Sequence, residues 1–334
     1  MSVLIIAEAG VNHNGDVNVA LQLCKAAKEA GADIIKFQTF KTELVLTKNA
    51  ALAEYQAKNT GASQTQYEMI KELELDYESF RKIKEYCDQI GIEFLSTPDD
   101  VESLNFLVSD LKLKRIKIGS GEITNIPFLR IVGSKRLPII LSTGMATLGE
   151  VERAITELEK AGSNDITLLH CTSNYPCPFN EVNLRAIETL RKAFGFNVGY
   201  SDHTQGISVP IAAVALGASV IEKHFTLDKS LPGPDHAASI NPEELRAMVE
   251  SIRNIEAALG GGIKKPVQSE LDISKVVRRK IVASKPIRKG TFFASENLTT
   301  KRTSDKGLPA EMWDYVIGYP APRDFAEDEG IEFQ

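Results

Sequence analysis

The sequence predicts a (β/α)8 barrel followed by a small β-rich domain. Eight short runs rich in β-branched residues alternate with amphipathic helical patterns from the start of the chain to about residue 260. Eight strand–helix units in that length are typical of a barrel. The alternative is a doubly wound open sheet, but the first strand–helix turn, "EAGVNHNGD", lacks the GxGxxG pattern that such sheets use to bind dinucleotides.

The eight expected strands lie at residues 3–9, 33–39, 92–97, 115–120, 138–143, 166–172, 197–202 and 220–225. Segments such as "LGEVERAITELEKAG" lie between them and close at glycine, a frequent end of a helix. The glycine-rich stretch "LGGGIKKPVQSE" then interrupts the pattern, and short strands broken by turns follow. We therefore expect a barrel over 1–262, a linker over 263–276 and a small β-rich domain over 277–334. A domain this small has little core, so it needs docking on the barrel or on a partner chain.

The composition is that of an ordinary globular protein, with 43% hydrophobic and 25% charged residues among 334. The net charge of -6 comes without a basic run or a basic–aromatic patch, so we expect no nucleic-acid partner. The start, "MSVLIIAEAG", has no basic flank and reads as a first strand rather than a signal peptide or membrane span. Four scattered cysteines without a CxxC pair favour a reduced, cytoplasmic protein.

Polar residues occur at the end of every expected strand, although inward positions of a barrel should be apolar unless function requires otherwise. Barrel chemistry gathers at the carboxyl ends of the strands. Taken singly, these residues have structural explanations, such as a helix cap or an ion pair of Glu222 with Lys36 or Lys117. Their convergence on one mouth instead predicts an active site. The residues concerned are Glu8, Lys36, Gln38, Thr97, Lys117, Ser120, Glu122, Ser142, Ser201, His203, Glu222 and His224.

Two histidines at the ends of neighbouring strands indicate a metal site. His203 follows the seventh strand and His224 ends the eighth, and neighbouring strands lie about 4.8 Å apart. Two imidazoles without a thiolate leave positions open for water and substrate oxygen, which suits an octahedral catalytic ion. We expect Mn²⁺, with Mg²⁺ or Co²⁺ as alternatives, while Zn²⁺ and Fe²⁺ stay open. Asp202 lies between Ser201 and His203, and its direction does not follow from the sequence.

The other polar residues suggest two poles of one pocket. Lys36 and Lys117, with several hydroxyl groups, offer the cations and donors that a small phosphorylated carboxylate requires. Carboxylates suited to the hydroxyls and amide of a neutral sugar stand opposite, at Glu8, Glu122, Glu222 and Asp235. An anionic substrate, a metal and a polyol in one mouth imply condensation of an anion with a carbonyl compound.

Eight motifs, in order along the barrel, resemble those of the sialic acid synthase family. They are "IAEAGVNHNGD", "KFQTF", "STP", "KIGSGE", "LSTGM", "LHCTSNYP", "GYSDHT" and "IEKHFTLDKSLPGPDHAAS". The C-terminal segment resembles the antifreeze-like (SAF) domain of the same enzymes. The resemblance implies that phosphoenolpyruvate condenses with an N-acetylmannosamine-type sugar to give a nine-carbon sialic acid and phosphate.

The resemblance also implies individual roles. Phosphoenolpyruvate would contact Lys36, Thr97, Lys117, Ser120, Ser142, Ser173 and Ser201, although some members have asparagine where this chain has Ser173. The sugar would contact Gln38, Glu122, Tyr175 and Asp235. His203 and His224 would hold the metal, with Glu8 or Glu222 as proton acceptor near the reacting centre. A domain-swapped homodimer would place Arg302 of "LTTKRTSD" over the partner's sugar, with Lys301 as the neighbouring alternative.

The acceptor sugar stays open between N-acetylmannosamine, which gives N-acetylneuraminate, and 2,4-diacetamido-2,4,6-trideoxymannose, which gives legionaminate. The residues of the motifs "GVNHNGD" and "KFQTFKTE" slightly favour the legionaminate type. Pseudaminate synthase and a 3-deoxy-sugar-acid synthase using an aldose phosphate are related alternatives, but no second basic cluster is evident. A metal-dependent hydrolase barrel would require a His-x-His pair on its first strand, but this chain has Asn12-His13-Asn14 there. A domain that only binds ice or glycan would not explain the polar interior.

Overall fold

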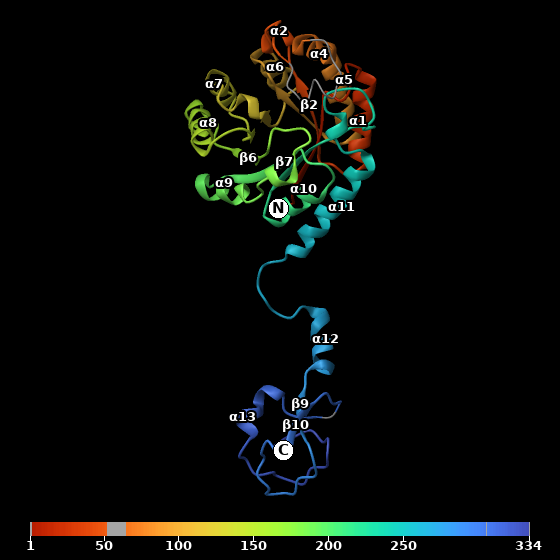
Figure 1. Cartoon of the computed structure of the whole chain (residues 1–334), viewed down its shortest axis with the longest axis vertical. Coiled ribbons are helices and arrows are strands. Elements are labelled where there is room, and N and C mark those ends of the chain that lie inside the picture. The colour runs from red at the N-terminus through yellow and green to blue at the C-terminus, as the bar shows by residue number, and fades with distance from the viewer. Residues whose placement is uncertain (1, 52–64, 305, 334) are drawn as a thin grey trace. The chain divides into compact units, whose positions relative to one another are not determined.

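The computed structural model describes residues 2–51, 65–304 and 306–333. The chain forms two compact units, Met1–Gly260 and Gly261–Gln334, which are coloured red to cyan and blue in Figure 1. The division falls inside the glycine run that follows helix α11 (Pro242–Leu259). Helix α12 (Gln268–Val277) occupies most of the segment expected as a linker. None of the helices in the described ranges combines the length and apolar character needed to span a bilayer.

The first unit is the predicted barrel of parallel strands. Hydrogen bonds join the strands in the order β3-β2-β1-β8-β7-β6-β5-β4, and β3 packs against β4 at the remaining seam. This order brings the first and last strands together, which excludes the open doubly wound sheet. The strands are β1 (Leu4–Gly10), β2 (Ile34–Thr39), β3 (Glu93–Pro98), β4 (Ile116–Ile118), β5 (Ile139–Ser142), β6 (Ile166–His170), β7 (Asn197–Asp202) and β8 (Val220–His224).

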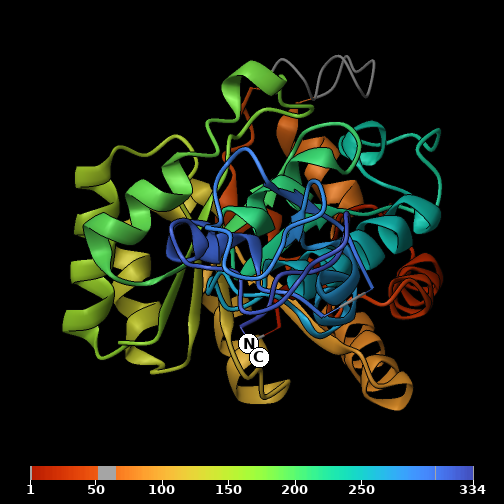
Figure 2. The same cartoon turned by 90° about the horizontal axis from the view of Figure 1, so that it is seen from below.

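Helices surround the strands. Figure 2 shows the yellow-green helices α7 and α8 on one side of this unit and the red and orange α1 and α5 on the other. With α11, the helices of this unit are α1 (Val17–Glu29), α2 (Thr42–Val45), α4 (Gln66–Leu73), α5 (Tyr77–Ile90), α6 (Val101–Asn105), α7 (Ile126–Ser134), α8 (Leu148–Ala161), α9 (Ala186–Phe194) and α10 (Ser208–Ala215). Local sequence fixes several ends: Thr147 and Glu150 form a capping box at α8, and Gly162 ends it in the left-handed conformation.

The strands are covered on both faces, by the helices outside and by side chains inside the barrel. All five residues of β8 are buried, and so are six of the seven in β1. Hydrophobic side chains such as Ile5, Ile35 and Ile221 are fully buried and fill the layers on either side of the strands. A polar side chain on the inner face therefore loses its water and needs a partner inside the protein.

The second unit contains α12, a short antiparallel strand pair and α13 (Trp313–Val316). Strand β9 (Lys280–Ala283) pairs with β10 (Leu298–Lys301), as the predicted β-rich ending requires. Isolated bridges such as Ile287 to Phe325 fasten the intervening loops. A separate small core gathers around Ile281, Phe293 and Phe325, all of which are buried.

Close packing of α7 against α8 gives a first testable expectation. A Cβ atom added at Gly133 would lie 2.7 Å from both the Ala161 Cβ and the Leu158 carbonyl oxygen. Gly133→Ala should therefore lower the free energy of unfolding by about 1–3 kcal/mol, measured by denaturant titration. Gly149→Ala is the matched control, because a Cβ there meets no atom within 4 Å. Its stability should be unchanged or slightly higher, and equal effects at both positions would contradict the packing argument.

Candidate active site

A cavity of about 530 Å³ opens at the carboxyl ends of the barrel strands. Most of the predicted site residues line this cavity. Glu122 and Asp235 lie beside it instead, and Arg302 belongs to the second unit. The predicted residues that line the cavity come from all eight strands or the turns that follow them. They are Glu8, Lys36, Gln38, Thr97, Lys117, Ser120, Ser142, Ser173, Tyr175, Ser201, His203, Glu222 and His224.

Four buried charges alternate in sign across the floor of this cavity. Lys36 Nζ lies 2.8 Å from Glu8 Oε2 and 3.7 Å from Glu222 Oε2. Lys117 Nζ lies 3.7 Å from Glu222 Oε1. The parallel register makes this possible, because β1 pairs with both β2 and β8 and sets Glu8 opposite Lys36. The sequence allowed Glu222 an ion pair with either lysine, and the structure places it between both.

The two glutamates of this charge row differ in their pKa values. Burial raises the pKa of Glu8 to about 7, against the opposing effect of Lys36. Glu222 is equally desolvated, but Lys117 and Lys36 together outweigh its burial and hold its pKa below the usual range. Burial lowers the pKa of Lys117, whereas Glu222 and Glu8 outweigh the burial of Lys36 and raise its pKa. Of these two glutamates, Glu8 is thus the one whose protonation changes near neutral pH.

Hydroxyl groups complete the part of the cavity around the lysines. Lys36 Nζ donates to Thr97 Oγ1 at 3.1 Å, and Lys117 Nζ donates to Ser142 Oγ at 2.6 Å. Ser201 Oγ donates to Glu222 Oε1 at 2.9 Å. These contacts hold the Thr97 and Ser142 hydroxyls beside a cation and the Ser201 hydroxyl beside the Glu222 carboxylate. The cavity therefore presents donors and positive charge from several strands to one small volume.

Gly144 lets two more hydroxyls approach. A Cβ atom at this position would lie 2.4 Å from Ser173 Oγ and 2.7 Å from Ser120 Oγ. The Gly144 backbone N–H donates to Ser120 Oγ at 3.0 Å, which fixes that side chain. Strand β4 is shorter than expected and ends at Ile118, so Ser120 and Glu122 belong to a 3₁₀ turn that follows it. A side chain at residue 144 would have to displace both serine hydroxyls, so glycine keeps them at their places in the cavity.

The two histidines predicted to hold a metal lie together at the mouth. The ring centroids of His203 and His224 are 5.5 Å apart. Burial lowers the pKa of both rings, so both are neutral near pH 7. His203 Nδ1 lies 2.6 Å from the Thr172 carbonyl oxygen, a contact that requires the proton on Nδ1 and leaves Nε2 as an acceptor. Asp235 Oδ2 lies 3.9 Å from His224 Nδ1.

These donors fit a divalent metal. Neutral imidazole is a ligand for Mn²⁺, Co²⁺ and Zn²⁺ alike. The buried Nδ1 atom of His224 has no hydrogen-bond partner among the described residues, so the ring is not committed to a structural role. Within those same residues, no third histidine, cysteine or carboxylate joins the pair in a cluster of ligand geometry. Water or substrate oxygen would therefore supply the other ligands.

Tyr175 lies against both histidines. Its ring centroid is 4.1 Å from that of His203 and 5.4 Å from that of His224. Gln38 Nε2 donates to Glu8 Oε1 at 3.4 Å on another side of the cavity. On the rim, Glu122 Oε2 accepts from Asn125 Nδ2 at 2.5 Å. Among the residues expected to contact a sugar, Tyr175 and Glu122 thus lie around the mouth, whereas Gln38 reaches Glu8 of the charge row.

Asp202 does not approach either imidazole ring. Its carboxylate accepts hydrogen bonds from the Tyr200 hydroxyl at 3.0 Å and from Thr204 Oγ1 at 2.9 Å, and it pairs with Lys223 Nζ at 2.5 Å. Asp202 and Lys223 alternate with the inward-facing residues of their strands and are both fully buried. Their role is to hold β7 and β8 together on the outward face, which the sequence pattern left undetermined.

Four further side chains line the cavity without having been predicted: Gln66, Asp99, Met145 and Cys171. Gln66 begins α4, and Asp99 follows Pro98, the last residue of β3, two residues after the predicted Thr97. Cys171 is buried, and its Sγ lies 3.2 Å from Ser120 Oγ. Asp99 carried a signal that could have been used, since it is a charged residue at the end of a strand.

A parallel (β/α)8 barrel with a buried, charged cavity at the carboxyl ends of its strands has the architecture of an enzyme. Residues 23–264 match the NeuB family, and residues 278–333 match the SAF domain. The chain belongs to the NeuB family. The resemblance to sialic acid synthases that the motifs predicted is therefore confirmed, together with the barrel and the SAF domain. Members of this family generally use a divalent metal.

Individual relatives cover nearly the whole chain. An N,N'-diacetyllegionaminic acid synthase of Campylobacter jejuni is 50% identical over 330 residues, which are 98% of each chain. The protein of the same name from Legionella pneumophila is 51% identical over 320 residues, covering 95% of this chain and 90% of that one. The crystal structure of an N-acetylneuraminic acid (sialic acid) synthetase from Leptospira borgpetersenii is similar with a TM-score of 0.72 and 36% identity. It covers 83% of this chain and 93% of the other.

The Asp202–Lys223 pair yields a prediction about stability. Lys223→Met would leave the buried Asp202 carboxylate without its cation, which should cost about 3–5 kcal/mol in the free energy of unfolding. The double variant Asp202→Asn/Lys223→Met should recover part of that loss, since no buried charge remains. Denaturant titration of both variants measures the difference.

The control is Lys192→Met, which breaks the exposed pair between Lys192 and Glu188 on α9. Such surface pairs contribute little, so its unfolding curve should overlay that of the unchanged protein. If Lys223→Met were equally harmless, the buried pair would not be holding the two strands together.

Proposed function

We propose that this chain condenses phosphoenolpyruvate with 2,4-diacetamido-2,4,6-trideoxymannose to give N,N'-diacetyllegionaminate and phosphate. Its membership of the NeuB family supports the reaction class, a phosphoenolpyruvate-dependent synthesis of a nine-carbon acidic sugar. The two legionaminic acid synthases that share about half of its residues support the choice of acceptor. N-acetylmannosamine is the second candidate, favoured by the likeness to the Leptospira sialic acid synthetase.

The observation that carries this proposal is the cavity in which two buried lysines and several hydroxyls face two neutral histidines. Lys36 and Lys117 would bind the phosphate and carboxylate of phosphoenolpyruvate with Thr97, Ser120, Ser142, Ser173 and Ser201. Gln38, Glu122, Tyr175 and Asp235 would contact the sugar. His203 and His224 would hold the divalent metal, which we expect to be Mn²⁺, with Mg²⁺ or Co²⁺ as alternatives.

The reaction joins carbon 3 of phosphoenolpyruvate to the aldehyde carbon of the open-chain sugar, whose oxygen takes up a proton and becomes a hydroxyl. Water adds at carbon 2, and the bond from that carbon to the phosphate oxygen breaks, releasing inorganic phosphate. The bound metal would supply Lewis acidity toward the aldehyde oxygen. We assign the proton of the attacking water to Glu8 rather than Glu222, because the pKa of Glu8, at about 7, lies near neutral pH and that of Glu222 lies below its usual range.

The direct test is phosphate release from phosphoenolpyruvate with a panel of acceptors, followed by mass measurement of the product. The panel contains 2,4-diacetamido-2,4,6-trideoxymannose, N-acetylmannosamine and a pseudaminate-type precursor. We expect the first to have the highest kcat/KM. EDTA should abolish release and Mn²⁺ or Co²⁺ should restore it, because a Lewis acid contributes several kcal/mol to such a step. Full activity in EDTA would refute the metal, and phosphate release without any dependence on sugar would refute the synthase.

We further propose that two chains complete each other's sites, with Arg302 of one SAF domain over the sugar of the partner subunit. The match of residues 278–333 to the SAF domain supports this, since it includes Arg302. The residue lies just after β10 and is exposed within its unit. Arginine offers several donors in a planar fork, which suits an acetamido or hydroxyl group.

Complementation tests the shared site. Chains with Arg302→Ala and chains with His203→Ala should each be inactive alone. After subunit exchange, a mixed dimer combines an intact barrel with an intact arginine and should regain up to about half of the original sites. Chains with Lys301→Ala should stay active alone, which separates the two neighbouring basic residues. Absence of recovery despite demonstrated heterodimers would show that Arg302 acts within its own chain or not at all.

A further inference from the structure

One carboxylate in the cavity has no place in the roles described so far. Asp99 follows β3 and lines the cavity together with Glu8, Lys36 and Thr97. Its backbone N–H donates to the Thr39 carbonyl oxygen at 3.2 Å, but its carboxylate makes no hydrogen bond or ion pair with another described residue. An acidic side chain that lies in a cavity without a partner is available to a ligand.

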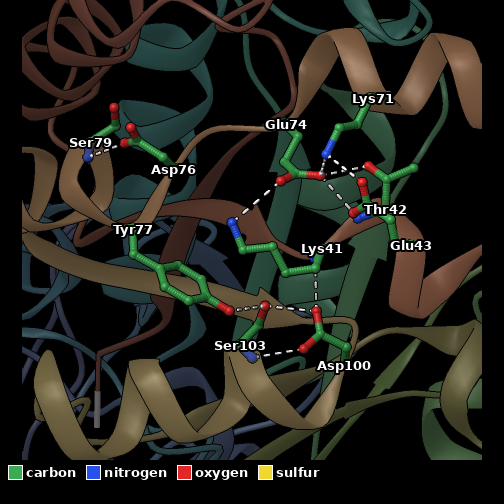
Figure 3. Close-up of polar contacts among 10 residues, drawn as sticks. All are labelled: Lys41, Thr42, Glu43, Lys71, Glu74, Asp76, Tyr77, Ser79, Asp100 and Ser103. Carbon is green, nitrogen blue, oxygen red and sulfur yellow. Dashed lines mark hydrogen bonds and ion pairs between the residues drawn. The ribbon is translucent and has the colours of Figure 1, made fainter.

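The neighbouring Asp100, in contrast, is bound into the structure by described residues. Asp100 caps α6, where it accepts hydrogen bonds at 2.7 Å from the backbone N–H and the hydroxyl of Ser103. It also accepts from the Lys41 backbone N–H at 2.8 Å, as Figure 3 shows. Asp100 is thereby committed to the structure around α6. Asp99, between this anchor and the strand, is held at the mouth by backbone contacts on both sides.

The charges around Asp99 disfavour phosphoenolpyruvate as its partner. The ionisable neighbours that act on it are Glu122, Lys36, Asp100 and Glu8, so three of the four are acidic. Lys36 is already paired with Glu8 and lies near Glu222. Burial, strengthened by Glu122, raises the pKa of Asp99 to about 7. A phosphate group placed here would meet a cluster of carboxylates, whereas a neutral ligand with O–H or N–H donors would satisfy them.

We propose that Asp99 is a specificity-determining residue that binds a donor group of the neutral acceptor sugar and disfavours acceptors that carry phosphate. This inference rests on the proposed function, because it assigns Asp99 to the sugar side of the same cavity. The group bound is a hydroxyl or an acetamido N–H. A carboxyl group accepts a hydrogen bond from either, and like-charge repulsion provides the discrimination against a sugar phosphate.

The test compares Asp99→Asn and Asp99→Ala with the full-length, metal-loaded protein. For each variant, kcat/KM is measured for the neutral acceptor and for phosphoenolpyruvate, and inhibition is measured with N-acetylmannosamine 6-phosphate. Asp99→Ala should lose about tenfold in kcat/KM for the neutral sugar, as expected for one hydrogen bond to a charged group. Asp99→Asn keeps the shape and hydrogen-bonding capacity but not the charge, so it should lose less and bind the sugar phosphate about tenfold more tightly. The KM for phosphoenolpyruvate should change by less than about threefold.

Glu102→Gln is the matched control, since it removes an exposed acid on the adjoining helix α6 that does not line the cavity. Its kinetic constants should equal those of the unchanged protein. Unchanged sugar kinetics and unchanged inhibition in Asp99→Asn would overturn the assignment while leaving the synthase intact. A change confined to phosphoenolpyruvate would overturn it by placing Asp99 at the anion. If the unchanged protein released no phosphate with any acceptor, the proposed function would fail, and this inference with it.

Discussion

The alternation of charge along Glu8, Lys36, Glu222 and Lys117 is the constraint on which the rest of the barrel interior depends. All four side chains are buried on the inner face of the strands, where little of their surface is exposed to solvent. Each is tolerable only because its neighbours carry the opposite charge, as the 2.8 Å and 3.7 Å separations show. Removing one member would leave the charges of its neighbours uncompensated. The register of the strands, the charges at the floor of the cavity and the charge of the substrate therefore depend on one another.

The same strands carry different chemistry on their two faces. On the inner face of β8, Glu222 and His224 serve the cavity, while Lys223 between them points outward to Asp202. The outward pair satisfies its charges within the protein and is closed to ligands. The inward histidines are neutral and include a nitrogen without a hydrogen-bond partner among the described residues, so they are open to a ligand. Successive side chains of a strand point to opposite faces. Residues 222–224 therefore contribute both to the binding site and to the stabilising ion pair.

Much of this could be predicted from the sequence, because β-branched runs and polar strand ends depend only on local pattern. The eight strands and the grouping of Lys36, Lys117, His203 and His224 follow from barrel geometry alone. Other features depend on sums of opposing effects that no local pattern displays. Burial raises the pKa of Glu8, whereas at Glu222 two lysines outweigh the effect of burial and lower the pKa. In the sequence, Asp99 and Asp100 are two equivalent acidic residues before a helix. Only the hydrogen bonds at the start of α6 show that Asp100 is the one that caps it.

Gly144 and Met145 are adjacent in the motif "LSTGM", yet they offer opposite prospects to anyone wishing to broaden the acceptor range by mutagenesis. Any side chain at Gly144 would displace the hydroxyls of Ser120 and Ser173. Met145 lines the cavity but is 74% exposed, and its φ of 63° is one that asparagine and glycine adopt more readily than methionine. A combinatorial library built on this scaffold would therefore randomise residue 145 and leave residue 144 untouched, sampling new shapes at the mouth without disturbing the hydroxyls below.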